Sequence, residues 1–217
     1  DTSLTAHLVL DASGSMGYGS GAISKFECAR FIIAALAYLL MGQEDSVGLV
    51  TCTSRIQKFL PPRSRRTHLK NILDTLEATE PGEDTGLAGV LHALANRIKR
   101  RGLIVIVSDL FDEPGRIITA LSHFAHKKHE VLLFQVLDRR EVTFPFRDMT
   151  RFESLEGADF QLVDPVRLRR EYLRQFEAHQ AAIREACHRL RIDFVPFYTD
   201  EPVDRAVAHY LARRLKR

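Results

Sequence analysis

Three residues in one short loop carry oxygen atoms that could bind a hard cation. Asp11, Ser13 and Ser15 alternate in the run DASGSM, and a tight turn would point their side chains at one spot. Thr85 and Asp109, further along the chain, offer two more side-chain oxygens. No His or Cys accompanies them in these loops, whereas a zinc site normally recruits those residues. A set made only of oxygen donors favours Mg²⁺, with Mn²⁺ as the alternative.

Such a site would hold the metal with few charged ligands. Mg²⁺ usually keeps several water molecules in proteins, so an open position could accept a carboxylate from another molecule. Binding of that kind needs no nucleophile. We therefore expect a non-catalytic protein-binding or adaptor domain that docks an acidic residue of a partner protein through the metal.

Strands and helices must bring these residues together. Residues 4–10 are mostly apolar and predict a buried strand that ends at Asp11. Ser24 and Glu27 have the spacing of a capping box, which predicts the start of a helix. The run LIVIVS at 103–108 predicts a strand that ends at Asp109, and Thr85 lies where a helix over 85–100 should begin.

The rest of the pattern alternates strands with helices. Strands are expected at 46–53, 56–60, 131–137 and 192–198, with Pro61 and Pro62 ending the second of these. Helices are expected at 68–78, at 114–128, after Pro165 and at 203–215, and 139–163 is less regular. The alternation predicts one domain, 1–217, of the α/β class: a doubly wound (Rossmann-like), mostly parallel central sheet with helices on both faces. Ligands bind such sheets at the carboxyl edge, where Asp11 and Asp109 should meet.

The composition is that of an ordinary globular protein, with 45% hydrophobic and 27% charged residues. Cys28, Cys52 and Cys187 are odd in number and far apart, which indicates reduced thiols and no disulfide framework. The longest uncharged apolar stretch, 31–42, is shorter than the about 20 residues of a membrane-spanning helix. We expect a cytoplasmic protein, while the start at Asp1 without Met leaves an upstream signal or membrane anchor open.

The loop residues resemble the metal-ion-dependent adhesion site (MIDAS) of von Willebrand factor A (VWA) domains. DASGSM matches its D-x-S-x-S core, Thr85 its separate threonine, and Asp109 in VSDL its distal aspartate. The resemblance implies that the serines and the threonine lie next to the metal and that the aspartates often act through water. It also implies that an Asp or Glu of the ligand completes the coordination.

A narrower resemblance, to the bacterial family called domain of unknown function 58, covers almost the whole chain. It is carried by LVLDASGSM, SKFECAR, DSVGLVTC, FLPPRSRRTHL, TGLAGVLHAL, VIVSDLFDEP and VDPVRLRREYLRQF. Members of that family often accompany MoxR-type AAA+ ATPases, so the resemblance implies such an ATPase as partner and an adaptor or chaperone-like role beside it. Both membrane-anchored and cytosolic forms occur in the family.

Two other functions are kept as alternatives. A metal-dependent hydrolase or phosphatase could use Asp11 as nucleophile, but the acid or base expected two residues later is replaced by Ser13. Ser13 also stands where a G-x-S-x-G nucleophile elbow needs Gly. Nucleic acid could contact the basic residues of the two C-terminal helices, but the net charge of +3 is small and no series of aromatic residues accompanies them.

Overall fold

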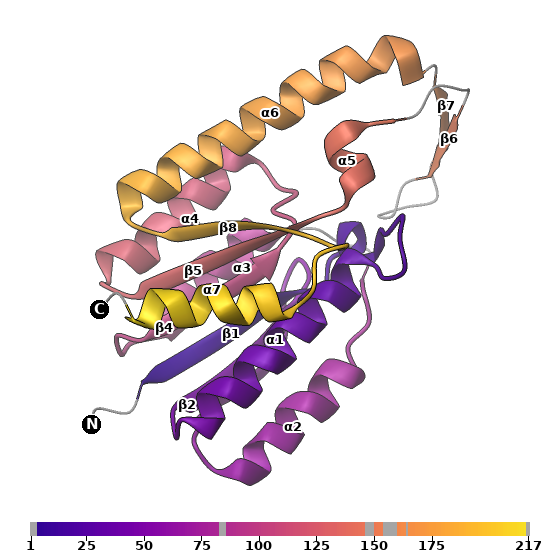
Figure 1. Cartoon of the computed structure of the whole chain (residues 1–217). Helices are drawn as coiled ribbons and strands as arrows, with labels where there is room; N and C mark the ends of the chain where they lie inside the picture. Colours follow the sequence, from indigo (N-terminus) through magenta and orange to yellow (C-terminus); the bar gives the residue numbers. More distant parts are fainter. Residues whose placement is uncertain (1–3, 83–85, 146–149, 154–159, 164, 216–217) are drawn as a thin grey trace.

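The computed structural model describes residues 4–82, 86–145, 150–153, 160–163 and 165–215. Figure 1 shows a central sheet with helices packed on both sides. The sheet contains strands in the order β3-β2-β1-β4-β5-β8, and all neighbouring pairs are parallel except β2 with β3. The strands are β1 (Thr5–Asp11), β2 (Ser46–Cys52), β3 (Ile56–Arg63), β4 (Leu103–Ser108), β5 (Glu130–Leu137) and β8 (Asp193–Tyr198).

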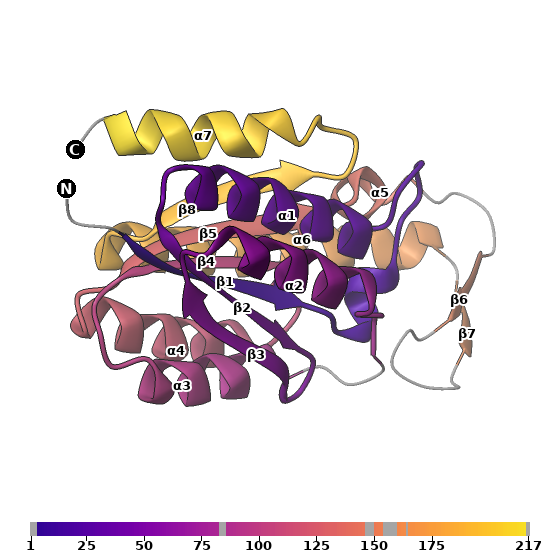
Figure 2. The same cartoon turned by 90° about the horizontal axis from the view of Figure 1, so that it is seen from below.

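The helices form a layer on each face of the sheet. Figure 2 shows α1, α2 and α7 on one side and α3 and α4 on the other. They are α1 (Lys25–Gly42), α2 (Arg66–Glu77), α3 (Leu87–Arg97), α4 (Pro114–His126), α6 (Pro165–Leu190) and α7 (Asp204–Leu215). This is the predicted doubly wound α/β fold, so the fold class is confirmed.

The alternating side chains of the strands supply two separate apolar cores. In β1, Leu8 and Leu10 pack with α1, α2 and α7, whereas Val9 packs with α3, α4 and α6. β4 divides in the same way, with Val105 on one side and Ile104 on the other. A strand with two buried faces must be apolar throughout, which explains why LIVIVS lacks a polar and apolar alternation.

The predicted end of the 56–60 strand at Pro61 is wrong, because β3 continues to Arg63. A proline can sit in an edge strand, where one of the two rows of backbone groups has no neighbouring strand. The pairing with β2 is irregular here, and Gly48 makes room for it: a Cβ atom at Gly48 would lie 2.7 Å from the Leu60 carbonyl oxygen. The prolines therefore lie within this edge strand without ending it.

The less regular segment contains three short elements. They are helix α5 (Arg139–Thr143) and the antiparallel pair β6 (Thr150–Glu153) and β7 (Phe160–Val163), which forms a sheet of its own. Figure 1 shows α5 at the carboxyl end of β5, below the long helix α6. None of the described helices combines the length and the apolar character that a membrane crossing requires.

Candidate functional site

The two aspartates predicted to meet do lie side by side in the fold. β1 and β4 are parallel neighbours, with Leu10 opposite Val107, so Asp11 at the end of β1 and Asp109 directly after β4 reach the same edge of the sheet. Chain connections leave β1 and β4 in opposite directions, toward β2 and toward β5. This is the point of an open α/β sheet where ligands bind.

The DASGSM loop turns its polar side chains inward. Asp11 Oδ1 accepts a hydrogen bond from the Ser13 backbone N–H at 2.9 Å, and Asp11 Oδ2 accepts one from Ser108 Oγ at 2.6 Å. A single 3-10 turn, η1 (Gly14–Gly17), then brings the hydroxyl oxygens of Ser13 and Ser15 to 3.3 Å from each other. Asp11 and Ser13 are almost fully buried, at 2% and 1% exposed. Local geometry thus gathers the three predicted loop residues.

The loop between β1 and α1 is also held in place from two sides. Ala12 donates its N–H to the Cys52 carbonyl, and its own carbonyl accepts from Gly82 N–H, both at 2.7 Å. Asp138, the N-cap of α5, accepts hydrogen bonds from the N–H and the hydroxyl of Ser20. These bonds fix the loop that leads into α1 without using the aspartates of the site.

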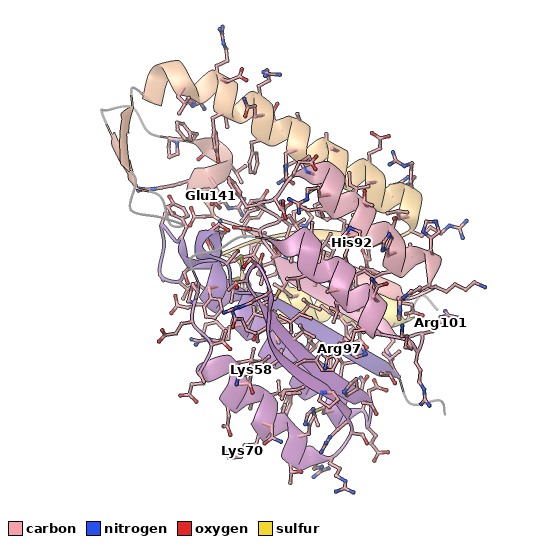
Figure 3. All side chains as sticks on the ribbon, turned by 180° about the vertical axis from the view of Figure 1, so that it is seen from behind. Lys58, Lys70, His92, Arg97, Arg101 and Glu141 are labelled. Atoms are coloured by element: carbon pink, nitrogen blue, oxygen red, sulfur yellow. The ribbon has the colours of Figure 1, made fainter. Side chains whose placement is uncertain are left out.

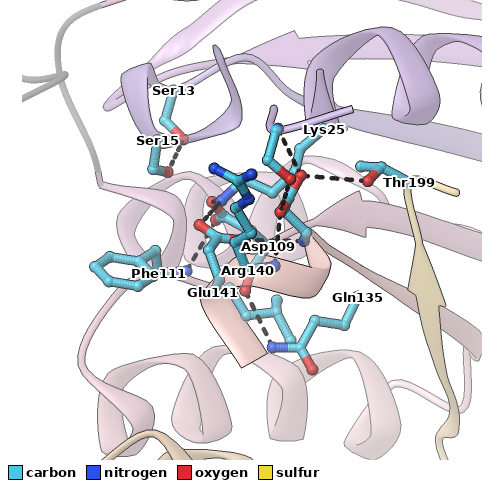
Figure 4. Close-up of polar contacts among 12 residues, drawn as sticks. Ser13, Ser15, Lys25, Asp109, Phe111, Gln135, Arg140, Glu141 and Thr199 are labelled. Carbon is cyan, nitrogen blue, oxygen red and sulfur yellow. Dashed lines mark hydrogen bonds and ion pairs between the residues drawn. The ribbon is translucent and has the colours of Figure 1, made fainter. Parts of the chain in front are cut away.

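A buried lysine occupies the space beside Asp109. Lys25 Nζ lies 2.7 Å from Asp109 Oδ2 and 2.6 Å from Glu141 Oε1, as drawn in Figure 4. The other oxygen of Asp109 accepts from the Phe111 N–H at 3.1 Å. Lys25 is only 1% exposed and joins three elements, because it begins α1, pairs with the residue after β4 and holds Glu141 of α5.

Two buried carboxylates, Asp11 and Asp109, lie close enough at this edge to repel each other when both are ionised. Burial raises the pKa of Asp11 to about 6, and the negative charge of Asp109 adds to the rise, against the hydrogen bonds from Ser108 and Ser13. Burial alone would lower the pKa of Lys25, but the carboxylates of Asp109 and Glu141 outweigh it and hold the pKa above its ordinary value. Lys25 is therefore a permanent cation at neutral pH. A second cation near Asp11 would relieve the remaining repulsion.

Thr85, the fourth predicted ligand, lies outside the described residues. The nearest described part of that segment is the start of α3, where the Ala88 N–H donates to Asp112 Oδ2 at 3.1 Å. Asp112 belongs to the loop that follows Asp109, so α3 begins beside that loop. The helix itself is shorter than the predicted 85–100 and ends at Arg97.

The residues present fit a hard divalent cation. The two serine hydroxyls are 3.3 Å apart, close to the about 2.9–3.0 Å between adjacent oxygens around an octahedral Mg²⁺. Asp11 adds a buried carboxylate beside them. Within the part of the chain that the structure describes, no three His, Cys, Asp or Glu side chains gather as a metal cluster, so a zinc-type site of those residues is not found there. The metal site itself stays a prediction.

Sequence reasoning missed Lys25, Ser108 and Glu141. One signal was present for Lys25: a lysine at the first position of a helix faces the positive end of the helix dipole, which is unfavourable without nearby carboxylates. Ser108 is the one polar residue of an otherwise apolar strand. Asp138 and Glu141 have the spacing of a capping box, but no local pattern marked the pairing of Glu141 with Lys25, which is 116 positions away.

Comparisons with known proteins agree with this architecture. The family model described as "Protein of unknown function DUF58" matches residues 1–182. Uncharacterized protein Rv1480 of Mycobacterium tuberculosis is 28% identical over 225 residues, covering 99% of this chain and 68% of that protein.

Solved structures show the same fold. BatB from Bacteroides thetaiotaomicron is similar with a TM-score of 0.65 and 16% identity, over 99% of this chain and 100% of that one. An aerotolerance-related membrane protein from Bacteroides fragilis gives 0.67 and 17%, over 94% and 96%. The SpRpn10 VWA domain gives 0.56 and 10%, over 95% and 94%. The fold is therefore VWA-like.

Proposed function

The chain belongs to the DUF58 family of proteins of unknown function, and we propose that it is a non-catalytic docking domain that binds an acidic residue of a partner protein through a divalent metal. The observation that carries this proposal is the meeting of Asp11, Ser13, Ser15 and Asp109 at one edge of a VWA-like sheet. Mg²⁺ fits these oxygen donors best, with Mn²⁺ as a substitute.

Each residue has a distinct part in the proposed site. Ser13 and Ser15 would hold the metal through their hydroxyl oxygens, and Thr85 would add a third hydroxyl. Asp11 and Asp109 would supply negative charge, either directly or through water. The bound metal would supply a positive centre for a partner carboxylate, while Lys25 keeps part of the Asp109 charge neutralised. The site would then remain attractive to an anion.

A hydrolase finds less support in the same contacts. The hydroxyls of Ser13 and Ser15 bond to each other, and the oxygens of Asp11 accept from Ser13 N–H and Ser108 Oγ. Within the described part of the site, none of these hydroxyls donates to a histidine, as an activated serine nucleophile would. Binding is therefore the function that the geometry supports best.

Calorimetric titration of Mg²⁺, and then of Mn²⁺, into chelator-stripped protein tests the metal site. We expect saturable binding near one equivalent in the parent, loss of binding in Asp11→Ala, and affinity at least about tenfold weaker in Ser13→Ala. Ser122→Ala changes a half-buried serine of α4 and is the matched control, which should bind like the parent. Far-UV circular dichroism should show an intact fold in all variants. Equal binding by Ser13→Ala and the parent would remove these residues as ligands.

The partner proposal has a separate test. A MoxR-type AAA+ ATPase is the proposed partner, because the family resemblance implies it. Size-exclusion chromatography of the two purified proteins should show a complex with Mg²⁺ that dissociates on addition of a chelator and does not form with Asp11→Ala. Metal binding without a complex would keep the metal site and discard this partner.

A further inference from the structure

A cavity of about 340 Å³ lies next to the candidate metal site, between the carboxyl end of β5 and helices α5 and α6. Lys25, Asp109 and Glu141 form one wall, and Phe111, Tyr172 and Phe176 contribute aromatic rings. Its volume lies in the range of small-ligand sites. Phe111 is 57% exposed, which is unusual for a large apolar side chain and leaves one wall open to an incoming group.

Two buried glutamines of this cavity each have one unused polar atom. Gln135 donates its Nε2 to the Asp109 carbonyl at 3.1 Å, and its Oε1 has no hydrogen-bond partner among the described residues. Figure 4 shows that amide nitrogen bonded toward Asp109, with the oxygen on the other side. Gln180 Nε2 likewise has no partner in the described part of the chain. The two side chains belong to residues 1% and 8% exposed, so bulk water does not reach these atoms freely.

The charged groups of the cavity are already satisfied. Each of the three lining carboxylates accepts a hydrogen bond on both of its oxygens. Asp109 accepts from the Phe111 N–H and from Lys25, and Glu141 accepts from Lys25 and from the Asp138 N–H. Asp112 accepts from the N–H groups of Glu113 and Ala88. His179 Nε2 bonds to the Leu110 carbonyl at 3.0 Å. Among the described residues that line the cavity, the buried side-chain atoms without any hydrogen-bond partner are Gln135 Oε1, an acceptor, and Gln180 Nε2, a donor.

An unused buried donor or acceptor is costly, so a ligand that satisfies both would gain free energy. A guanidinium or ammonium group could satisfy only Gln135, and an anion would meet three carboxylates against one lysine. A neutral carboxamide has both an N–H donor and a carbonyl acceptor on one planar group, and its alkyl stem suits the aromatic rings.

We propose that this cavity binds the carboxamide side chain of a Gln or Asn residue on a partner polypeptide, with its N–H donating to Gln135 Oε1 and its carbonyl accepting from Gln180 Nε2. The inference goes beyond the metal-dependent docking and does not require the metal. Asp109 lines both places, so one partner segment could reach the two sites together.

Nuclear magnetic resonance with isotope-labelled protein and excess chelator tests this directly. N-acetylglutamine methylamide should shift the side-chain amide signals of Gln135 and Gln180 saturably, whereas N-acetylmethionine methylamide should not. Gln180→Met should weaken binding of the glutamine probe on the order of threefold to tenfold, the effect of one lost hydrogen bond. Gln57→Met is the matched control, because Gln57 is an exposed glutamine of β3 outside the residues that line this cavity, and it should leave the affinity unchanged.

Any one of four results would overturn the inference. One is a glutamine probe that causes no saturable shift, or that binds Gln180→Met as tightly as the parent. Another is acetamide binding as tightly as the capped glutamine, which would assign the cavity to a small free amide. The last is a thermal unfolding midpoint clearly lower in Gln180→Met than in the parent: the midpoint should stay equal or rise, because the variant removes a buried donor without a partner.

Discussion

At the scale of single residues, Asp11 carries a conflict between stability and binding. Its carboxylate is 2% exposed and lies near the charge of Asp109, so the pKa is raised to about 6. A raised acid pKa means that the protonated form fits the fold best. The contribution of Asp11 to stability is therefore greatest at low pH and is lost as the pH rises through about 6.

We predict that Asp11→Asn makes the metal-free protein more stable at pH 8, by on the order of 1–3 kcal/mol. The substitution removes a buried charge while the side chain keeps nearly the same shape. The same variant should no longer gain stability when Mg²⁺ is added, whereas the parent should. Urea denaturation with and without Mg²⁺ measures both quantities. A metal-free Asn variant less stable than the parent at pH 8 would mean that the ionised carboxylate stabilises the fold.

At the scale of elements, Lys25 connects α1, the segment after β4, and α5. Its ammonium lies between Asp109 and Glu141, and the Tyr172 hydroxyl of α6 donates to the Glu141 carbonyl at 2.9 Å. Burial raises the pKa of Glu141 above its usual value, and Lys25 opposes that rise. Lys25 is therefore the buried charged contact that ties α5 to α1 and to the segment after β4.

Lys25→Met should lower the free energy of unfolding by about 3–5 kcal/mol, because it leaves two carboxylates buried without their cation. Mg²⁺ should restore more stability to this variant than it adds to the parent, since the metal supplies positive charge at the same edge. Lys70→Met is the control: Lys70 pairs with Asp74 on the exposed surface of α2, and its loss should leave the stability nearly unchanged. Equal effects of the two substitutions, in denaturant titrations, would argue against a structural role for the buried pair.

At the scale of the whole molecule, the two edges of the sheet differ in their buried titratable groups. The carboxyl edge holds Asp11, Asp109 and Lys25, whereas the amino edge holds His7, His129 and Asp45, which pairs with Arg214. Figure 3 shows Glu141 at the end with the candidate site and Arg101 at the opposite end. Burial lowers the pKa of His7 to about 4, and the neighbouring His129 contributes to the decrease. Acid should thus destabilise the amino edge through His7, whereas at the carboxyl edge it protonates Asp11.

A histidine with a lowered folded-state pKa stabilises the fold above its unfolded value of 6.5, and that stability is lost as the pH falls toward 4. Between pH 7.5 and 5, His7 should account for a loss of about 2 kcal/mol in the free energy of unfolding. His7→Leu should lose correspondingly less over the same range, as measured by denaturant titration at each pH. Parallel pH profiles of the variant and the parent would show that His7 is not the group responsible.

The basic residues of α6 are partly used within the fold, which bears on the nucleic-acid alternative. Arg169 donates to the carbonyls of Phe144 and Thr143, and Arg174 pairs with Glu171 on the same helix. These contacts reduce the number of cations that could meet a phosphate backbone. No observation favours nucleic acid over the docking function.

The sequence by itself determined the α/β alternation, most of the strands, the capping box of α1 and the meeting of Asp11 with Asp109. These depend on local signals: apolar runs, the Ser24 and Glu27 spacing, and the rule that parallel strands share a carboxyl edge. Asp11, Ser13 and Ser15 gather within one turn, so their spacing was sufficient to place them together.

Only the tertiary structure decided which groups surround that loop. Ser108 reaches Asp11 across 97 positions, and Lys25 reaches Asp109 across 84. The tertiary structure also decided the cavity between β5 and α6. It decided the length of β3 as well, because the prolines are tolerated only where the strand lies at an edge of the sheet. Contacts between distant segments depend on how helices pack against the sheet, and no local spacing of residues encodes that packing.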